Sequence, residues 1–271
     1  MPKWRYLAID VDGTLLDDHD RFAVSRLNDD IQQLTGQGVM LIVASGNSYD
    51  ALQSIFRSCP TVTNFVAENG GRIIVNGHEI LSQPHHKETI VDLLEFIATI
   101  VPQPDLLSLS GANQTFIAQR YRHVAVPYYP HHTYFTHLST VNEPIYNLNI
   151  SWSYHHPALT WIHQLVAKLN QRFPTIHATY SGAWGIDILP AGVNKADGLC
   201  QLIKSRGGTM ADLVAFGDTS NDQEMIAAAG CGYAMQNATP DLLTIADRVT
   251  KFDNNHNGLL REIEMLYHLM H

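Results

Sequence analysis

Short apolar runs, separated by helical patterns or turn residues, recur at both ends of the chain. They lack the alternation of apolar and polar residues that marks a strand with one wet face, and several are rich in small or β-branched residues. Such runs are typical of strands buried on both faces of a parallel sheet. The runs are WRYLAI (4–9), VMLIVA (39–44), FVA (65–67), LVAF (213–216) and GYAM (232–235).

The connections between these runs have helical periodicity. Between the first two runs, Leu27, Ile31 and Leu34 follow one another at spacings of four and three, which gives a single apolar stripe. A strand, a helix and a second strand at these lengths predict a right-handed βαβ unit. The same rhythm returns near the C-terminus, where residues 196–208, 224–230 and the segment opened by Thr239-Pro240 favour helices.

The middle of the chain follows a different pattern. RIIVNGHEIL surrounds Asn76-Gly77, a strong signal for a β-hairpin turn. Residues 87–100 and 157–173 are amphipathic and predict helices, and the segment between them consists of short, proline-interrupted aromatic runs. This pattern indicates an antiparallel sheet with helices on one face.

These patterns predict an α/β fold. We expect a Rossmann-like, doubly wound parallel sheet as the core, built from residues 1–82 and 186–271. Residues 83–185 should form an inserted α+β module.

Composition narrows the possible partners. The chain has 26 acidic and 17 basic residues, a formal net charge of −9, and no cluster of lysine and arginine. A nucleic acid or an anionic membrane surface is therefore not an expected partner. No segment approaches 18 uninterrupted apolar residues, so we expect a cytoplasmic protein. A small phosphorylated molecule is the expected partner, and the chain is expected to be a monomer or a small homo-oligomer.

Polar residues follow three of the apolar runs. Because the carboxyl ends of parallel strands meet at one edge of the sheet, these residues should share a crevice. Several carboxylates there would repel one another, and a divalent cation with oxygen ligands, best Mg²⁺, would relieve the repulsion. An Asp-x-Asp-Gly segment alone more often marks a loop, so the prediction of a site depends on the three polar clusters together. The residues are Asp10, Asp12 and Gly13, then Ser45 and Gly46, then Asp218, Asn221 and Asp222.

The order of these clusters, with Lys195 between the second and the third, resembles the haloacid dehalogenase superfamily. DVDGTL (10–15), Ser45, Lys195 in GVNKADGL, and GDTSND (217–222) are similar to its four motifs. The stretch 227–250 is similar to the Cof-type branch, whose class IIB cap is inserted between motifs two and three. The segment 83–185 falls in that place.

The resemblance implies a phosphatase that hydrolyses small phosphorylated metabolites, such as sugar phosphates, through an aspartyl-phosphate. Asp10 would be the nucleophile, and Asp12 would carry the proton to and from the leaving group and water. Asp222 would orient Lys195 or a metal-bound water. Mg²⁺ would be held by Asp10, the Asp12 carbonyl and Asp218; the phosphate would be bound by Val11, Ser45, Gly46, Lys195 and Asn221.

Two alternatives share these motifs. A phosphomutase would pass the phosphoryl group to a sugar hydroxyl, and a non-catalytic sensor would only bind the phosphometabolite. The sequence also departs from the branch at Asn47, where an arginine is usual, and this change removes a positive charge near the phosphate. Candidate selectors of the leaving group in the cap are YYPHH (128–132), Arg120, Arg122 and SYHH (153–156).

Overall fold

An eight-stranded sheet, built from both ends of the chain, forms the larger of two lobes in the computed structural model, which describes residues 4–126 and 129–269. Its strand order is β14-β13-β12-β1-β2-β3-β4-β5, and the first six of these strands run parallel. The antiparallel hairpin of β4 and β5 closes one edge. The strands are β1 (Tyr6–Ile9), β2 (Met40–Ala44), β3 (Asn64–Ala67), β4 (Arg72–Val75), β5 (His78–Ser82), β12 (Leu213–Gly217), β13 (Cys231–Ala234) and β14 (Arg248–Val249).

The apolar runs form the strands that their pattern predicts. Strand β1 is buried along its whole length, as expected for a strand covered on both faces. In the first crossover helix, Leu27, Ile31 and Leu34 are the apolar residues that turn into the core. The hairpin turn is at Asn76 and Gly77, both with positive φ, and this confirms the expected turn. The helices of this lobe are α1 (Val24–Gly36), α2 (Tyr49–Ile55), α5 (Lys195–Ser205), α6 (Gln223–Ala228), α7 (Pro240–Ile245) and α8 (Gly258–Tyr267).

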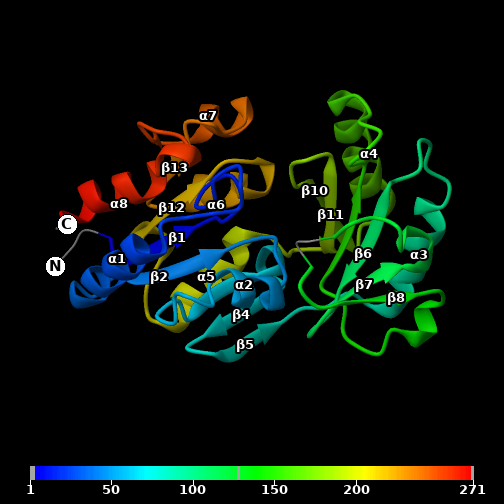
Figure 1. Cartoon of the computed structure of the whole chain (residues 1–271), viewed down its shortest axis with the longest axis horizontal. Helices are drawn as coiled ribbons and strands as arrows, with labels where there is room; N and C mark the ends of the chain where they lie inside the picture. The colour runs from blue at the N-terminus through cyan, green and yellow to red at the C-terminus, as the bar shows by residue number, and fades with distance from the viewer. Residues whose placement is uncertain (1–3, 127–128, 270–271) are drawn as a thin grey trace.

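The middle of the chain forms a second, six-stranded sheet with the order β10-β11-β9-β6-β7-β8. Helices α3 (Lys87–Ile97) and α4 (Leu159–Arg172) share one apolar cluster with alternate residues of the central strands. Figure 1 shows this lobe beside the larger one, with both chain termini at the far end of the larger lobe. The strands are β6 (Leu106–Ser110), β7 (Thr115–Ala118), β8 (His132–Phe135), β9 (Asn147–Ser151), β10 (Ile176–Tyr180) and β11 (Gly185–Pro190).

Two features of the smaller lobe differ from the expectation. Strands β7 and β8 pair in parallel, because the connection of residues 119–131 is long enough to return the chain in the same direction. Strand β11 belongs to the smaller sheet, so the expected boundary at 185 falls inside a strand. We call residues 4–82 and 191–269 the core and residues 83–126 and 129–190 the cap. That these two parts are separate domains stays a prediction.

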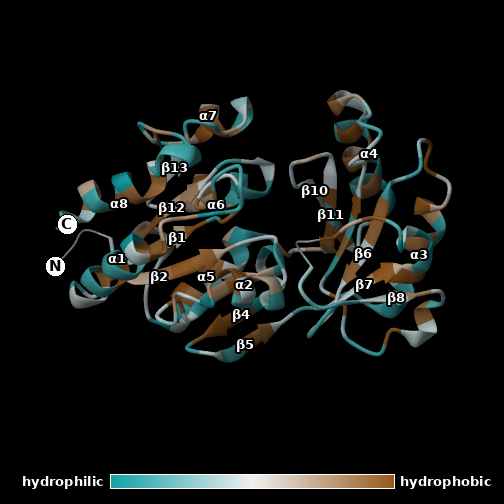
Figure 2. Cartoon of the chain, viewed as in Figure 1, coloured by the Kyte–Doolittle hydropathy of each residue, from teal (hydrophilic) through white to brown (hydrophobic). Residues whose placement is uncertain are grey.

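The apolar residues are segregated into two interior clusters, one for each lobe. Figure 2 shows the apolar colour along β1 and β2 of the core and β6 of the cap, whereas polar positions alternate along the surrounding helices. Within the described residues, none of the helices combines the length and the apolar character needed to cross a bilayer. Buried polar residues are uncommon in a protein interior, so they indicate where a functional site lies, and several of them lie where the core meets the cap.

Candidate active site

A buried lysine connects two aspartates at the carboxyl edge of the core sheet. Asp10 directly follows β1, and its amide continues the ladder by donating to the carbonyl of Phe216 at 3.0 Å. Lys195 is the first residue of α5, and its Nζ lies 2.7 Å from Asp10 Oδ1 and 2.7 Å from Asp222 Oδ1. All three side chains are at most 7% exposed.

This ion-pair cluster favours the charged form of the expected nucleophile and opposes the effect of its burial. Burial raises the pKa of Asp10, and the ammonium group of Lys195 opposes that shift. Burial on its own would lower the pKa of Lys195, but the carboxylates of Asp10 and Asp222 outweigh it and raise the pKa above its ordinary range. Lys195 therefore stays positively charged and stabilises the ionised form of Asp10, the form that can attack a phosphorus atom.

Asp218 adds a third carboxylate to the cluster. It directly follows β12, and oxygens of Asp10, Asp218 and Asp222 lie within 4.8 Å of one another. Burial, with the negative charges of Asp10 and Asp222, raises the pKa of Asp218. Its Oδ1 is buried and has no hydrogen-bond partner in the described part of the chain. One ammonium group thus lies among three buried carboxylates, and one carboxylate oxygen is left without a hydrogen-bond partner.

The residues present fit a divalent cation. The donors are hard oxygens, and a positive charge would relieve both the repulsion and the unpartnered oxygen of Asp218. Gly13 lies directly against Asp218, where a Cβ atom would collide with Oδ2, and its φ of +71° suits glycine. Both oxygens of Asp222 are already used, by Lys195 and by the amides of Asp218 and Thr219, so Asp10 and Asp218 are the better ligands.

Asp12 differs from Asp10 because it is exposed to solvent. Its Oδ2 accepts a hydrogen bond of 2.6 Å from Asn47 Nδ2. Desolvation by the surrounding protein atoms raises the pKa of Asp12, whereas the hydrogen bond from Asn47 lowers it. Asp10 is 5% exposed and Val11 is fully buried, so Asp12 is the first residue after β1 that reaches the surface. Asn47, at the position where an arginine is usual, thus contacts the expected proton carrier.

The expected phosphate-binding residues border the same edge. Ser45 follows β2 and is buried, and its Oγ accepts hydrogen bonds from the amide and the side chain of Asn47 at 3.1 and 3.2 Å. Asn221 lies in the short helix after Asp218, and its Nδ2 donates to Asn69 Oδ1 at 3.1 Å. The structure therefore brings the side chains from all four motifs to one edge of the sheet.

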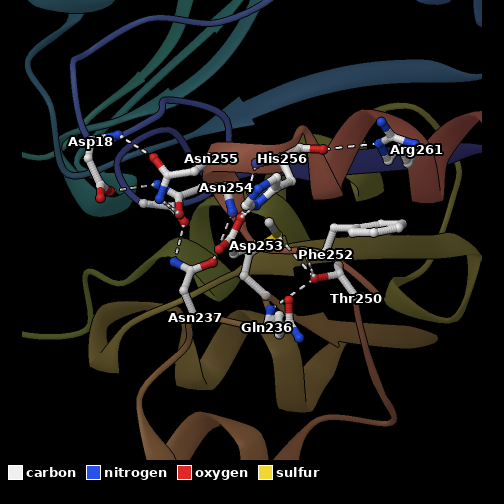
Figure 3. A network of polar contacts seen from close by, with 12 residues as sticks. Asp18, Gln236, Asn237, Thr250, Phe252, Asp253, Asn254, Asn255, His256 and Arg261 are labelled. Atoms are coloured by element: carbon white, nitrogen blue, oxygen red, sulfur yellow. Dashed lines mark hydrogen bonds and ion pairs between the residues drawn. The ribbon is translucent and has the colours of Figure 1, made fainter.

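The loop after Asp12 is held from the C-terminal part of the chain. Asn237 Nδ2 donates to the carbonyl of Gly13 at 2.8 Å, and Asn254 Nδ2 donates to the carbonyl of Leu16 at 2.9 Å. The Asn254 amide in turn donates to Asn237 Oδ1 at 3.1 Å, and Figure 3 shows these two asparagines beside each other. The network fixes the backbone that carries Asp12 and Gly13.

Two polar residues at this site were not expected from the sequence. Asn69 lies two residues after β3. The available signal was therefore a polar residue after the apolar run FVA, in addition to the three runs already considered. Asp187 lies in β11 of the cap and accepts a hydrogen bond from Asn69 at 2.8 Å. A single acid inside the apolar run GIDIL is unusual, and that was the signal for Asp187.

The candidate selectors in the cap fall into two groups. His131 Nδ1 lies 2.7 Å from Asp50 Oδ1 in α2 and so joins the cap to the core, while residue 128 lies outside the described residues. Arg120 and His155 border a surface hollow of about 460 Å³ that is lined by cap residues alone. Neither group is found among the contacts of the buried carboxylates described above.

Comparison with known proteins identifies the family of this chain. The family described as haloacid dehalogenase-like hydrolase matches residues 7–263. The 5-amino-6-(5-phospho-D-ribitylamino)uracil phosphatase YbjI of Escherichia coli is 30% identical over 265 residues, which cover 96% of this chain and 95% of the relative.

Solved structures give the same answer for the fold. The SMU.1108c protein of Streptococcus mutans has a TM-score of 0.87 at 27% identity, and the match covers 97% of this chain and 98% of that one. The HAD subclass IIB sugar phosphatase BT4131 has a TM-score of 0.81 at 16% identity, covering 98% of this chain and 100% of that one, and so shows the fold alone. The family match over residues 7–263 and the full-length relatives show that the chain belongs to the haloacid dehalogenase-like hydrolases, as a phosphatase of the Cof-type branch.

Proposed function

We propose that this protein is a Mg²⁺-dependent phosphatase that hydrolyses small phosphorylated metabolites through a phosphorylated Asp10. The observation that carries the proposal is the position of Asp10, held between the buried ammonium group of Lys195 and the partly unpartnered carboxylate of Asp218. A structural ion pair needs no third carboxylate with a free oxygen, whereas a phosphoryl-transfer site needs positive charge at that point.

The reaction would proceed in two displacements at phosphorus. A carboxylate oxygen of Asp10 forms a bond to phosphorus while the bond to the leaving oxygen breaks, and Asp12 gives its proton to that oxygen. A water molecule then attacks phosphorus, Asp12 takes its proton, and the bond to Asp10 breaks to release inorganic phosphate. Mg²⁺ held by Asp10, the Asp12 carbonyl and Asp218 would reduce the repulsion between the carboxylate and the phosphate.

The other residues of the site have roles that suit these two displacements. Lys195, the hydroxyl of Ser45, the amides of Val11 and Gly46, and Asn221 would bind the phosphoryl oxygens. Asp222 accepts hydrogen bonds from Lys195 and from two backbone amides of the loop 217–222, and it would hold both in place. Asn47 would orient Asp12 for proton transfer.

The cap supports a small, polar leaving group. Ser108, Asn149 and Asp187 are paired in register across β6, β9 and β11, so they form one polar row on the sheet. Asp187 in this row contacts Asn69 of the core, so this face lies toward the core. The groups of this row already bond to one another and to Asn69 and Tyr129, and a sugar or sugar-like leaving group suits such polar surroundings better than a long apolar chain does.

The test is phosphate release from a panel of phosphomonoesters, with Mg²⁺ and with a chelator. The panel should include the phosphoribitylaminouracil compound named for the E. coli relative, together with hexose and pentose phosphates. We expect release that depends on Mg²⁺ and is abolished in Asp10→Asn. The absence of release from all compounds by folded protein would contradict the proposal, and transfer of the phosphoryl group to a sugar hydroxyl would indicate a mutase.

A further inference from the structure

The turn that follows β3 contacts the two loops expected to bind phosphate. This turn, residues 68–70, is buried, and Glu68 and Asn69 have φ values of +53° and +50°. Left-handed backbone is unfavourable for side chains other than glycine and asparagine, so the surrounding contacts hold it in place. The Asn69 amide donates to the Ser45 carbonyl at 2.9 Å, and the Glu68 amide donates to the Asn47 carbonyl at 3.1 Å.

The side chain of Asn69 lies between the cap and the loop 217–222. Its Nδ2 donates to Asp187 Oδ2 of the cap at 2.8 Å, and its Oδ1 accepts from Asn221 Nδ2 at 3.1 Å. Asn69 is 1% exposed and Asp187 is 5% exposed. Gly46 lies directly beside this pair, since a Cβ atom there would approach Asn69 Nδ2 to 3.0 Å and Asp187 Oδ2 to 3.1 Å.

The cap carboxylate determines which way the core amides point. An ionised carboxylate only accepts hydrogen bonds, so Asn69 must present its Nδ2 to Asp187 and therefore its Oδ1 to Asn221. Asn221 then presents its Nδ2 to Asn69, and its Oδ1 accepts from the Thr219 hydroxyl at 2.7 Å. Asn149 of the cap donates to Asp187 Oδ1 at 2.8 Å and holds the carboxylate in place.

We propose that Asn69 is a positioning residue that couples the seating of the cap to phosphate binding, with Asp187 as its partner in the cap. The inference rests on the proposed function, because it takes Ser45, Gly46 and Asn221 as phosphate-binding groups. When the cap lies on the core, Asp187 fixes the Asn69 amide, and Asn69 fixes the Asn221 amide beside Gly46. The phosphate site is therefore complete only with the cap in place.

An exchange of the two side chains provides the test. Asn69→Asp places two carboxylates against each other. We therefore expect the inhibition constant of inorganic phosphate and the KM of the substrate both to rise about tenfold or more. Asp187→Asn leaves one acceptor oxygen for the two amides of Asn69 and Asn149, so the orientation of the Asn69 amide is no longer fixed and a rise of about threefold to tenfold is expected. In the double variant Asn69→Asp/Asp187→Asn, an amide again faces a carboxylate, and affinity should return to within about threefold of the wild-type value.

The control introduces the same change, Asn to Asp beside a carboxylate, at a surface position of the cap. Asn113 is exposed, and its side chain lies 3.4 Å from Glu143 Oε2, so Asn113→Asp also brings two carboxylates together. We expect wild-type affinity for phosphate in this variant. A purely structural role for Asn69 would lower the melting temperature of Asn69→Asp without changing the inhibition constant.

A binding readout separates this inference from the proposed function. The shift in melting temperature caused by inorganic phosphate with Mg²⁺ needs no turnover, and it should shrink in both single variants and recover in the double variant. Failure of the wild type to release phosphate from any phosphomonoester would contradict the proposed function alone. Additive losses in the double variant would overturn the coupling. An unchanged phosphate affinity in Asp187→Asn would overturn it as well, and this variant should fold because it brings no two carboxylates together.

Discussion

Glu68 allows a quantitative prediction about the contact between core and cap. Its side chain is fully buried, and Ser110 of the cap donates to Oε1 at 2.9 Å. Burial raises the pKa of Glu68 from its ordinary value of 4.5 to about 8. Between these two pH values the folded protein keeps a proton that the unfolded chain has lost. The free energy of unfolding therefore decreases as the pH rises through this window, and this contribution is constant above it.

The size of the effect follows from the two pKa values. A difference from 4.5 to about 8, at about 1.4 kcal/mol for each pKa unit, amounts to about 5 kcal/mol as an upper value. Glu68→Gln removes this penalty, because glutamine has no proton to lose and keeps an oxygen that can accept from Ser110. For a chain of this length, 1 kcal/mol corresponds to about 2 °C, so the melting temperatures should differ by up to about 10 °C at pH 8.

The assay is thermal unfolding of the wild type and Glu68→Gln at several pH values from 5 to 8. We expect the advantage of the variant to grow steadily with pH. Other titrating groups, such as His85, whose pKa burial lowers to about 4, are common to both proteins and cancel in the difference. Glu95→Gln, at an exposed position of α3 in the cap, controls for the loss of one carboxylate. A difference that stays constant from pH 5 to 8 would refute the reasoning.

Three further substitutions test the site. Lys195→Met leaves buried carboxylates unpaired, so we expect a loss of about 3–5 kcal/mol of stability, measured by denaturant unfolding, together with loss of turnover; wild-type stability would show that the ion pairs contribute little. Gly13→Ala forces a Cβ atom against Asp218 Oδ2, and the Mg²⁺ concentration for half-maximal activity should rise at least about tenfold; an unchanged Mg²⁺ dependence would speak against Asp218 as a ligand. Asn47→Ala removes the hydrogen bond to Asp12, and steady-state kinetics should show kcat reduced about tenfold; an unaltered kcat would mean that Asp12 needs no such support.

Much of the core was predictable because each part has a local signal. The apolar runs are short and uninterrupted, so they identify the buried strands, and Leu27, Ile31 and Leu34 identify the face of α1 that packs on them. The motif residues follow strands of a parallel sheet, whose carboxyl ends meet at one edge whatever the loops do. The proximity of Asp10 to Lys195 follows from this geometry together with the start of α5.

The contacts between core and cap were not predictable in the same way. Asn69 and Asp187 are separated by 118 positions, and no local pattern states that β11 lies over the turn after β3. The parallel pairing of β7 with β8 depends on the course of a long connection rather than on periodicity. The role of Asn47 also depends on tertiary structure, because only the fold shows that its amide reaches Asp12.

Identification of the phosphorylated residue tests the central claim most directly. Wild-type protein is mixed with Mg²⁺ and a rapidly hydrolysed phosphomonoester, stopped with acid during turnover and reduced with borohydride, which converts an aspartyl phosphate to homoserine. Trypsin should release the peptide of residues 6–21, and mass spectrometry should place the homoserine at position 10. Phosphate release without modification of Asp10, or with modification of another residue, would contradict the account, as would turnover by Asp10→Asn.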